Sequence, residues 1–201
     1  MSIAYDTFMK QYHATGSEKA DGYSRSAFIG LTPSEKEEVF RLLATELPWS
    51  VESLFFVDAE RALPIAVEAE KQDRNNPYGD TYMLQAAIVN YTGDLTYQEH
   101  MIQDYPAYHK SEKRQVISAI NRTPTNETTI GFFKKLILTE TNPDAVAGAS
   151  IYFLNSRNVS NVTQRDRVVY DRLLDELRSD DTSTKLRAIA QVESLTRLVD
   201  S

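Results

Sequence analysis

The sequence contains no cysteine, which excludes disulfide bonds, thiolate metal sites and cysteine nucleophiles. Only seven glycines occur among 201 residues, and neither phosphate-binding glycine loop, Gly-x-x-x-x-Gly-Lys or Gly-x-Gly-x-x-Gly, is present. A Gly-x-Ser-x-Gly nucleophile elbow is absent as well. There is no apolar run of about 18 residues and no secretory signal at the N-terminus, so we expect a cytoplasmic protein without a membrane segment. We also expect no cofactor and no catalytic residues.

Histidine is scarce too. The three histidines are His13, His100 and His109, and no two of them have the spacing of a metal site on one helical face. Glu99 and His100 are adjacent, so on a helix their side chains point about 100° apart and do not converge. We therefore predict no bound metal.

Negative charge is concentrated in the N-terminal half. Residues 1–100 contain 8 Lys and Arg against 16 Asp and Glu, whereas residues 101–201 contain 14 against 13. An acidic half repels nucleic acid and attracts a basic partner. The alternative is that the charge serves solubility alone.

Helical periodicity is what the sequence contains in abundance, without useful alternation of period two, so we expect an all-α protein. Two stripes of i, i+3, i+4, i+7 type alternate along the chain. One recurs from Gln98 at steps of 31 and 41 residues, and the other recurs from Leu84 at steps of 32, 31 and 41. Two stripes in step predict stacked antiparallel helical hairpins, an α-solenoid. A compact, non-repeating helical bundle is the alternative.

We expect a single domain, in which residues 1–57 form an N-terminal helical cap or a degenerate repeat and residues 58–201 form the repeats. Thr32 and Glu35 have the spacing of a capping box, and Asp58 is a candidate N-cap of the next helix, about 59–71. Pro64 should bend or delay the helix that follows Asp58. Residues 16–30 have the composition of a loop. The expected helices are 3–13, 33 to about 47, 59–71, 81–91, 95–105, 112–122, 127–139, 143–155, 165–178 and 183–199.

Six of the eleven tyrosines fall between residues 78 and 108. Tyr91 and Tyr105 occupy stripe positions, so we expect them in the core. The others lie among carboxylates off the stripes, a pattern typical of a surface that binds a basic protein. The alternative is that they pack between helices. The predicted partner-binding residues are Tyr78, Asp80, Tyr82, Gln85, Asp94, Tyr97, Glu99, Asp104, Tyr108 and Glu112.

Basic residues gather in the C-terminal half, at Lys134, Lys135, Arg165, Arg167 and Arg172. Acidic residues are interspersed with the arginines, which is typical of a lattice of i,i+4 surface ion pairs. We therefore predict no nucleic-acid site on this strip.

The segment Tyr82–Asp94, YMLQAAIVNYTGD, resembles the inner helix and turn of HEAT-like repeats. Residues 121–125 echo residues 90–94, and residues 145–155 provide another degenerate inner helix. The resemblance covers about residues 58–199. The repeats depart from the family pattern because they are short and lack a consistent arginine after the turn.

Small HEAT-like proteins include bacterial immunity proteins, lyase-like bilin-handling proteins and alkyl-base DNA glycosylases, and the chain looks most like the first group. The resemblance implies a non-enzymatic protein that neutralises a cognate toxin, a basic domain, by covering its active cleft. A glycosylase-like groove is basic, which the acidic half opposes. Two alternatives stay open. One is an enzyme or small-molecule binder in the concave groove, with Trp49, Tyr82, Glu99 and His100 as candidates. The other is an adaptor in a larger assembly.

Overall fold

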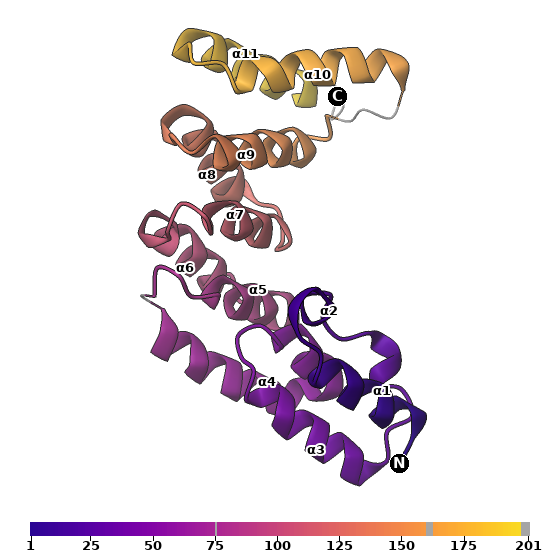
Figure 1. The fold of residues 1–201 in the computed structure, drawn as a ribbon. Helices are drawn as coiled ribbons and strands as arrows, with labels where there is room; N and C mark the ends of the chain where they lie inside the picture. Colours follow the sequence, from indigo (N-terminus) through magenta and orange to yellow (C-terminus); the bar gives the residue numbers. More distant parts are fainter. Residues whose placement is uncertain (75, 160–162, 198–201) are drawn as a thin grey trace. The chain divides into compact units, whose positions relative to one another are not determined.

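The fold is entirely helical in the part of the chain that the computed structural model describes, residues 1–74, 76–159 and 163–197 (Figure 1). The all-α prediction is confirmed to that extent, whereas the α-solenoid stays a prediction. Two 3-10 turns, η1 (Arg25–Ala27) and η2 (Tyr105–Ala107), accompany the α-helices. The α-helices are α1 (Ile3–Tyr12), α2 (Gly16–Ala20), α3 (Pro33–Ala44), α4 (Val51–Asp73), α5 (Thr81–Thr92), α6 (Thr96–Asp104), α7 (Lys113–Asn121), α8 (Glu127–Thr139), α9 (Pro143–Ser156), α10 (Gln164–Leu177) and α11 (Thr182–Arg197).

The chain divides into two compact units, residues 1–97 and residues 98–201. The first unit carries 8 Lys and Arg against 15 Asp and Glu, whereas the second carries 14 of each. The whole net charge of −7 therefore belongs to the first unit. The division falls between residues 97 and 98 and not at residue 57, the predicted end of the N-terminal cap. The single domain stays a prediction.

In the first unit, one apolar core holds α1, η1, α3 and the start of α4 together. Phe8 is fully buried in it, and its ring stacks on Tyr23 with 5.1 Å between the centroids. Leu43 from α3 and Leu54 from α4 are also fully buried in this cluster. α4 packs along α5 as well, and Leu84 of α5 lies in the core between them. The two helices that carry the candidate site below are thus anchored by their inner faces.

The capping box predicted at the start of α3 is present. The backbone N–H of Thr32 donates to Glu35 Oε2 at 2.9 Å, and the N–H of Glu35 donates to Thr32 Oγ1 at 3.4 Å. The backbone N–H of Ser2 donates to Glu35 Oε1 at 2.7 Å, which ties the start of α1 to the start of α3. These donors, Thr32 first, lower the pKa of Glu35 to about 2.

α4 is broken at Asp58, as its capping potential predicts. The backbone of Asp58 is not helical (φ −159°, ψ 92°), and its Oδ1 accepts a hydrogen bond from the N–H of Arg61 at 3.3 Å. The guanidinium of Arg61 then forms two hydrogen bonds with Glu37 of α3, at 2.7 and 2.9 Å. Pro64 lies inside α4, and its own backbone stays helical. The break is therefore at the cap residue.

The prediction of a continuous loop over residues 16–30 is wrong. This stretch contains α2 (Gly16–Ala20) and η1. The ammonium of Lys19 pairs with Glu46 at 2.8 Å and donates to the hydroxyl of Tyr23 at 3.0 Å. Side chains far along the chain thus support a helical turn that local propensity does not favour.

In the second unit, each helix from α7 to α11 packs against others of the unit. α8 packs on α9, and α10 packs on α11; α9 also contacts α7 and α10, and α11 contacts α8.

Across both units, the residues of the two predicted stripes are buried or half-buried with one exception. Tyr105 is in the core as predicted, but Tyr91 is 46% exposed, so its core assignment is wrong. The expected end of the last helix, residues 198–199, lies outside the described residues. No described helix has the length and apolarity to cross a membrane.

Candidate functional site

The candidate site is a groove between α4 and α5 on the surface of the first unit. Its volume is about 340 Å³. α4 contributes Glu52, Phe55 and Phe56 at spacing i, i+3, i+4 before its break at Asp58, and Ala59 just after the break, whereas α5 contributes three residues at i, i+3, i+4. We call it the aromatic groove; its lining residues are Glu52, Phe55, Phe56, Ala59, Ala87, Asn90 and Tyr91.

Aromatic rings of this groove face solvent. Phe56 is 48% exposed and Tyr91 is 46% exposed, although both are large and mostly apolar. Phe55 is half-buried and meets Tyr91 edge to face with 5.3 Å between the ring centroids. Phe56 also lies 5.7 Å from the ring of Phe28, and the guanidinium of Arg25 lies 5.7 Å from the Phe56 centroid. Phe56 and Tyr91 are thus each held by a neighbouring ring, while about half of each side chain stays exposed.

The local sequence explains this exposure. Residues 51, 54 and 57 of α4 are buried against the rest of the unit. A helix that buries one face presents the residues at the intervening positions outward. Phe56 and Tyr91 therefore lie outside the core. Exposed aromatic residues in a hollow are typical of contact surfaces.

Three of the ten predicted partner-binding residues are buried, so the expectation that they lie on the surface is wrong. Tyr82 and Tyr108 are each 6% exposed and Gln85 is inaccessible. The hydroxyl of Tyr82 donates to Asp80 Oδ1 at 2.9 Å, and the amide of Gln85 donates to the buried Glu70 at 2.9 Å. α5 is buried around most of its circumference, so positions off its stripe are covered as well.

The other seven predicted residues are exposed or half-buried, and they are divided between the two units. In the first unit, Tyr78 and Asp94 are exposed, and Asp80 and Tyr97 are half-buried. In the second unit, Glu99 is exposed, and Asp104 and Glu112 are half-buried. Burial, with the carboxylates of Glu70 and Asp94, raises the pKa of Tyr97. Partner binding by these residues stays a prediction.

Within the first unit, Tyr78 and Asp80 do lie together. They line a hollow of about 440 Å³ at the ends of α4 and α5, with Asp73 and Gln72 of α4 beside them. Asp94 serves a structural purpose elsewhere, because its Oδ1 accepts the N–H of Thr96 at the start of α6, at 3.0 Å. The aromatic groove contains none of the ten residues.

The residues proposed for a concave-groove enzyme do not gather in one unit. Trp49 is half-buried in the first unit, against the ring of Tyr23 at 5.4 Å. Glu99 and His100 belong to the second unit. Within residues 1–74, 76–159 and 163–197, no group of three His, Asp or Glu side chains is placed to hold a metal ion.

The basic strip shows the predicted i,i+4 ion pairs in part. Arg167 pairs with Asp171 at 3.8 Å, and Arg172 pairs with Glu176 at 3.1 Å. Lys134 instead reaches Glu193 of α11 at 2.6 Å. The side chain of Arg165 lies outside the described residues.

Sequence reasoning missed the aromatic groove because Phe55 and Phe56 stand in an apolar run, Leu-Phe-Phe-Val, that reads as core. A signal was present, since the run precedes a cap at Asp58 and only one face of so short a helix can lie against the core, so two adjacent phenylalanines cannot both be fully buried. Tyr91 was missed because it continues a genuine stripe at the end of α5. Its ring lies where the core has already ended.

No protein-family model, curated protein or solved structure matches the chain. The resemblance to HEAT-like immunity proteins therefore stays a prediction. Function follows from sites and not from fold alone.

Proposed function

We propose that this protein is a non-enzymatic binding protein that recognises one basic protein partner through the aromatic groove. In its specific form, it is a cytoplasmic immunity protein that neutralises a toxin by covering the toxin's active cleft. The observation that carries the proposal is a set of exposed, prearranged aromatic rings in the unit that holds the entire net charge of −7.

The aromatic groove supports a protein contact because large rigid rings bury much area at little cost in side-chain entropy. Phe56 and Tyr91 are braced by Phe28 and Phe55, so they lose little freedom when a partner covers them. Glu52 at the groove wall adds a carboxylate that a lysine or arginine of the partner can pair with.

The charge distribution supports a basic partner. A unit with 15 acidic and 8 basic residues steers a positively charged protein toward itself and speeds their association. An acidic protein that covers a basic cleft excludes the cleft's anionic substrate by occupancy and by charge. That is the behaviour an inhibitor of a nucleic-acid-directed or phosphate-directed toxin needs.

The helix packing of the second unit supports an α-solenoid. α9 packs on α7 and α8 before it and on α10 after it, and α11 packs back on α8. Successive hairpins with contacts mainly to their neighbours are the pattern of a repeat scaffold.

The test is capture of partners on tagged protein from its native cells, with identification by mass spectrometry and a toxicity assay of the captured protein. We expect one stoichiometric basic protein, whose activity is lost in the complex and whose capture falls as NaCl rises from about 50 to about 500 mM. The double variant F56A/Y91A should lower its affinity at least roughly tenfold.

Two controls separate the sites. Ile3→Ala removes an apolar side chain on α1 that is 87% exposed and lies outside the groove, and it should leave capture unchanged. Tyr78→Ala removes the most exposed tyrosine of the sequence-predicted surface, and binding that depends on Tyr78 but not on Phe56 and Tyr91 would move the site there. If the tagged protein retains a small molecule and captures no protein, the proposal is wrong.

A further inference from the structure

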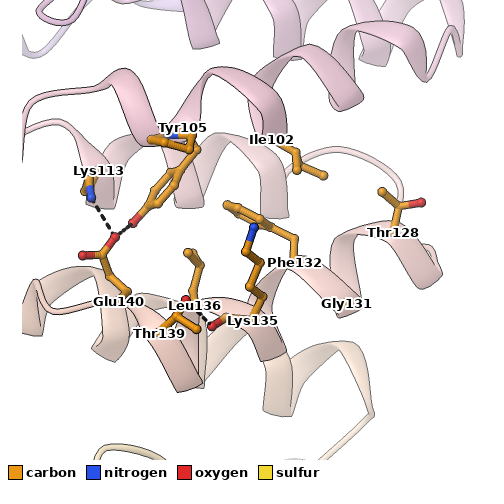
Figure 2. Close-up of a pocket in the computed structure, with 11 residues that line it drawn as sticks. Ile102, Tyr105, Lys113, Thr128, Gly131, Phe132, Lys135, Leu136, Thr139 and Glu140 are labelled. Carbon is orange, nitrogen blue, oxygen red and sulfur yellow. Dashed lines mark hydrogen bonds and ion pairs between the residues drawn. The ribbon is translucent and has the colours of Figure 1, made fainter.

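A second hollow lies in the second unit, between α8 and the segment formed by α6 and η2 (Figure 2). Its volume is about 410 Å³, within the range of sites that hold small organic ligands. Phe132 and Leu136 of α8 form an apolar floor, and Ile102 and Pro106 form the opposite wall. We call it the α8 pocket.

One end of the α8 pocket is closed by Glu140, toward which Tyr105 and Lys113 are both directed (Figure 2). Glu140 Oε2 accepts the hydroxyl of Tyr105 and the ammonium of Lys113, each at 2.8 Å. Its Oε1 accepts the backbone N–H groups of Thr141 at 2.8 Å and Asn142 at 3.0 Å. Every strong acceptor site of this carboxylate is therefore occupied from within.

These bonds make the closed end electrically neutral. Burial on its own raises the pKa of Glu140, but the hydrogen bonds from Lys113, Asn142 and Tyr105 outweigh it and lower the pKa to about 2. Burial and the Glu140 carboxylate raise the pKa of Tyr105, so its hydroxyl stays protonated. At neutral pH the ion pair of Glu140 and Lys113 contributes no net charge to the pocket.

Lys135 supplies a positive charge that nothing in the pocket balances. It lines the α8 pocket from α8 and is exposed. Its neighbour Lys134 pairs with Glu193, whereas no ion pair within the described ranges involves Lys135. The charged side chains that line the pocket therefore sum to a net charge of +1, which comes from Lys135.

Gly131 leaves the floor of the pocket open. It lies inside α8, where glycine is less favourable than alanine because its backbone loses more freedom on folding. A Cβ built at this position meets no atom within 4 Å, and its backbone is ordinary helix, so neither packing nor conformation requires glycine. The open space next to Cα is the α8 pocket itself.

We propose that the α8 pocket binds a small amphipathic anion, a free carboxylate with an apolar body. The carboxylate pairs with Lys135, and the body lies over Gly131 against Phe132 and Leu136. An apolar hollow with one unbalanced cation favours such a molecule over a neutral or cationic analogue. This site is in a different unit from the aromatic groove and does not depend on the proposed function.

The test compares three small-molecule probes that share an eight-carbon skeleton and differ in their polar group: octanoate, 1-octanol and octylammonium. Isothermal titration calorimetry of the full chain should show one octanoate per molecule, with 1-octanol roughly tenfold weaker and octylammonium weaker still. Lys135→Gln should reduce octanoate affinity to that of 1-octanol and leave 1-octanol unchanged. Gly131→Leu should abolish binding of both, because the leucine side chain fills the floor.

The matched control is Lys10→Gln, which removes an exposed lysine of α1 that does not line the pocket and should leave octanoate binding unchanged. Far-UV circular dichroism of each variant checks that the helices are retained. Three results would overturn the proposal: no octanoate binding at millimolar concentration, octylammonium as tight as octanoate, or full octanoate affinity in Gly131→Leu.

Discussion

Lys19 is surrounded by three aromatic rings and a carboxylate. Its ammonium lies 4.9 Å from the ring centroid of Tyr12 and 5.0 Å from those of Tyr23 and Trp49. It also pairs with Glu46, and both side chains are three-quarters or more buried. Cation–π contacts and charge-assisted hydrogen bonds strengthen when they are shielded from water. One lysine thus fastens α2 to the core of the first unit.

Replacement of this lysine by an apolar side chain of similar length should loosen the first unit. We expect Lys19→Met to lower the free energy of unfolding by about 1–2 kcal/mol, because the carboxylate of Glu46 loses its cation. Urea unfolding followed by Trp49 fluorescence measures the effect beside the substitution. Lys10→Met is the control, at an exposed position of α1. If Lys19→Met changes the free energy of unfolding by less than about 0.5 kcal/mol, the Lys19 contacts do not stabilise the unit.

Glu140 makes stability depend on pH in the acid range. Its pKa is about 2 in the folded protein and near 4.5 without these contacts. A carboxylate whose pKa is lowered by folding stabilises fully above the unfolded pKa, and this contribution is lost as pH falls toward the folded pKa. We expect a loss on the order of 3 kcal/mol from this group between about pH 4.5 and pH 2.

The variant Glu140→Gln isolates this contribution, since Glu35 and Asp181 also have lowered pKa values and add their own acid dependence. We expect the variant to be less stable at pH 7, by about 2–3 kcal/mol, because the half-buried Lys113 is left without its partner. The difference from the unmodified protein should shrink as pH falls to about 2. Thermal unfolding across this range measures it, and a difference that stays constant with pH would contradict the assignment.

At the scale of the helix, two glycines with equal space around them should respond in opposite ways. Neither Gly131 nor Gly93 would bring a Cβ within 4 Å of another atom. Gly131 is helical, so Gly131→Ala should stabilise by about 0.5–1 kcal/mol. Gly93 ends α5 with φ +75°, so Gly93→Ala should destabilise by about 1 kcal/mol. Urea unfolding monitored by circular dichroism tests both, and equal signs would contradict the argument.

The helices were predictable where their ends carry their own chemistry. Thr32 and Glu35 start α3, Asp58 interrupts α4, and Gly93 stops α5, each through contacts within a few residues. α2 was not predictable, because Lys19 supports it through residues up to 27 positions away. Sequence motifs such as helix caps identify contacts between residues that are close in the chain. Contacts between distant residues produce no characteristic residue spacing, so the sequence does not reveal them.

The candidate site was less predictable than the fold. The sequence indicates that aromatic and acidic residues concentrate in one region, but it does not tell which helix is covered on two sides. Burial around most of α5 removes Tyr82 and Gln85 from the surface, whereas Tyr91 of the same helix stays exposed. The i, i+3, i+4 rule identifies faces of a helix and is silent on how many of them the neighbours cover.

At the scale of the whole molecule, the uneven charge should make the first unit sensitive to salt. Like charges within it repel over a Debye length of about 30 Å at 0.01 M salt and about 8 Å at 0.15 M. We expect added NaCl over this range to stabilise the first unit by about 0.5–1 kcal/mol. Trp49 is the only tryptophan and lies in this unit, so its fluorescence reports the unit selectively.

The control for the salt effect is Glu60→Gln, which removes one exposed carboxylate from the first unit and should reduce the salt dependence. If the midpoint of unfolding, followed by Trp49 fluorescence, falls as salt rises, ion pairs such as Arg61 with Glu37 outweigh the repulsion between like charges. Circular dichroism, which follows the helices of both units, should shift less than fluorescence because the second unit has no net charge.

The open space at Gly131 also offers a handle for covalent chemistry. The chain has no cysteine, so Gly131→Cys would create the molecule's only thiol, placed at the floor of the α8 pocket. Disulfide exchange with a library of thiol-bearing fragments would then retain those that fit the surrounding walls. Mass spectrometry of the intact protein would identify the retained fragments directly, since each adduct has a single possible point of attachment.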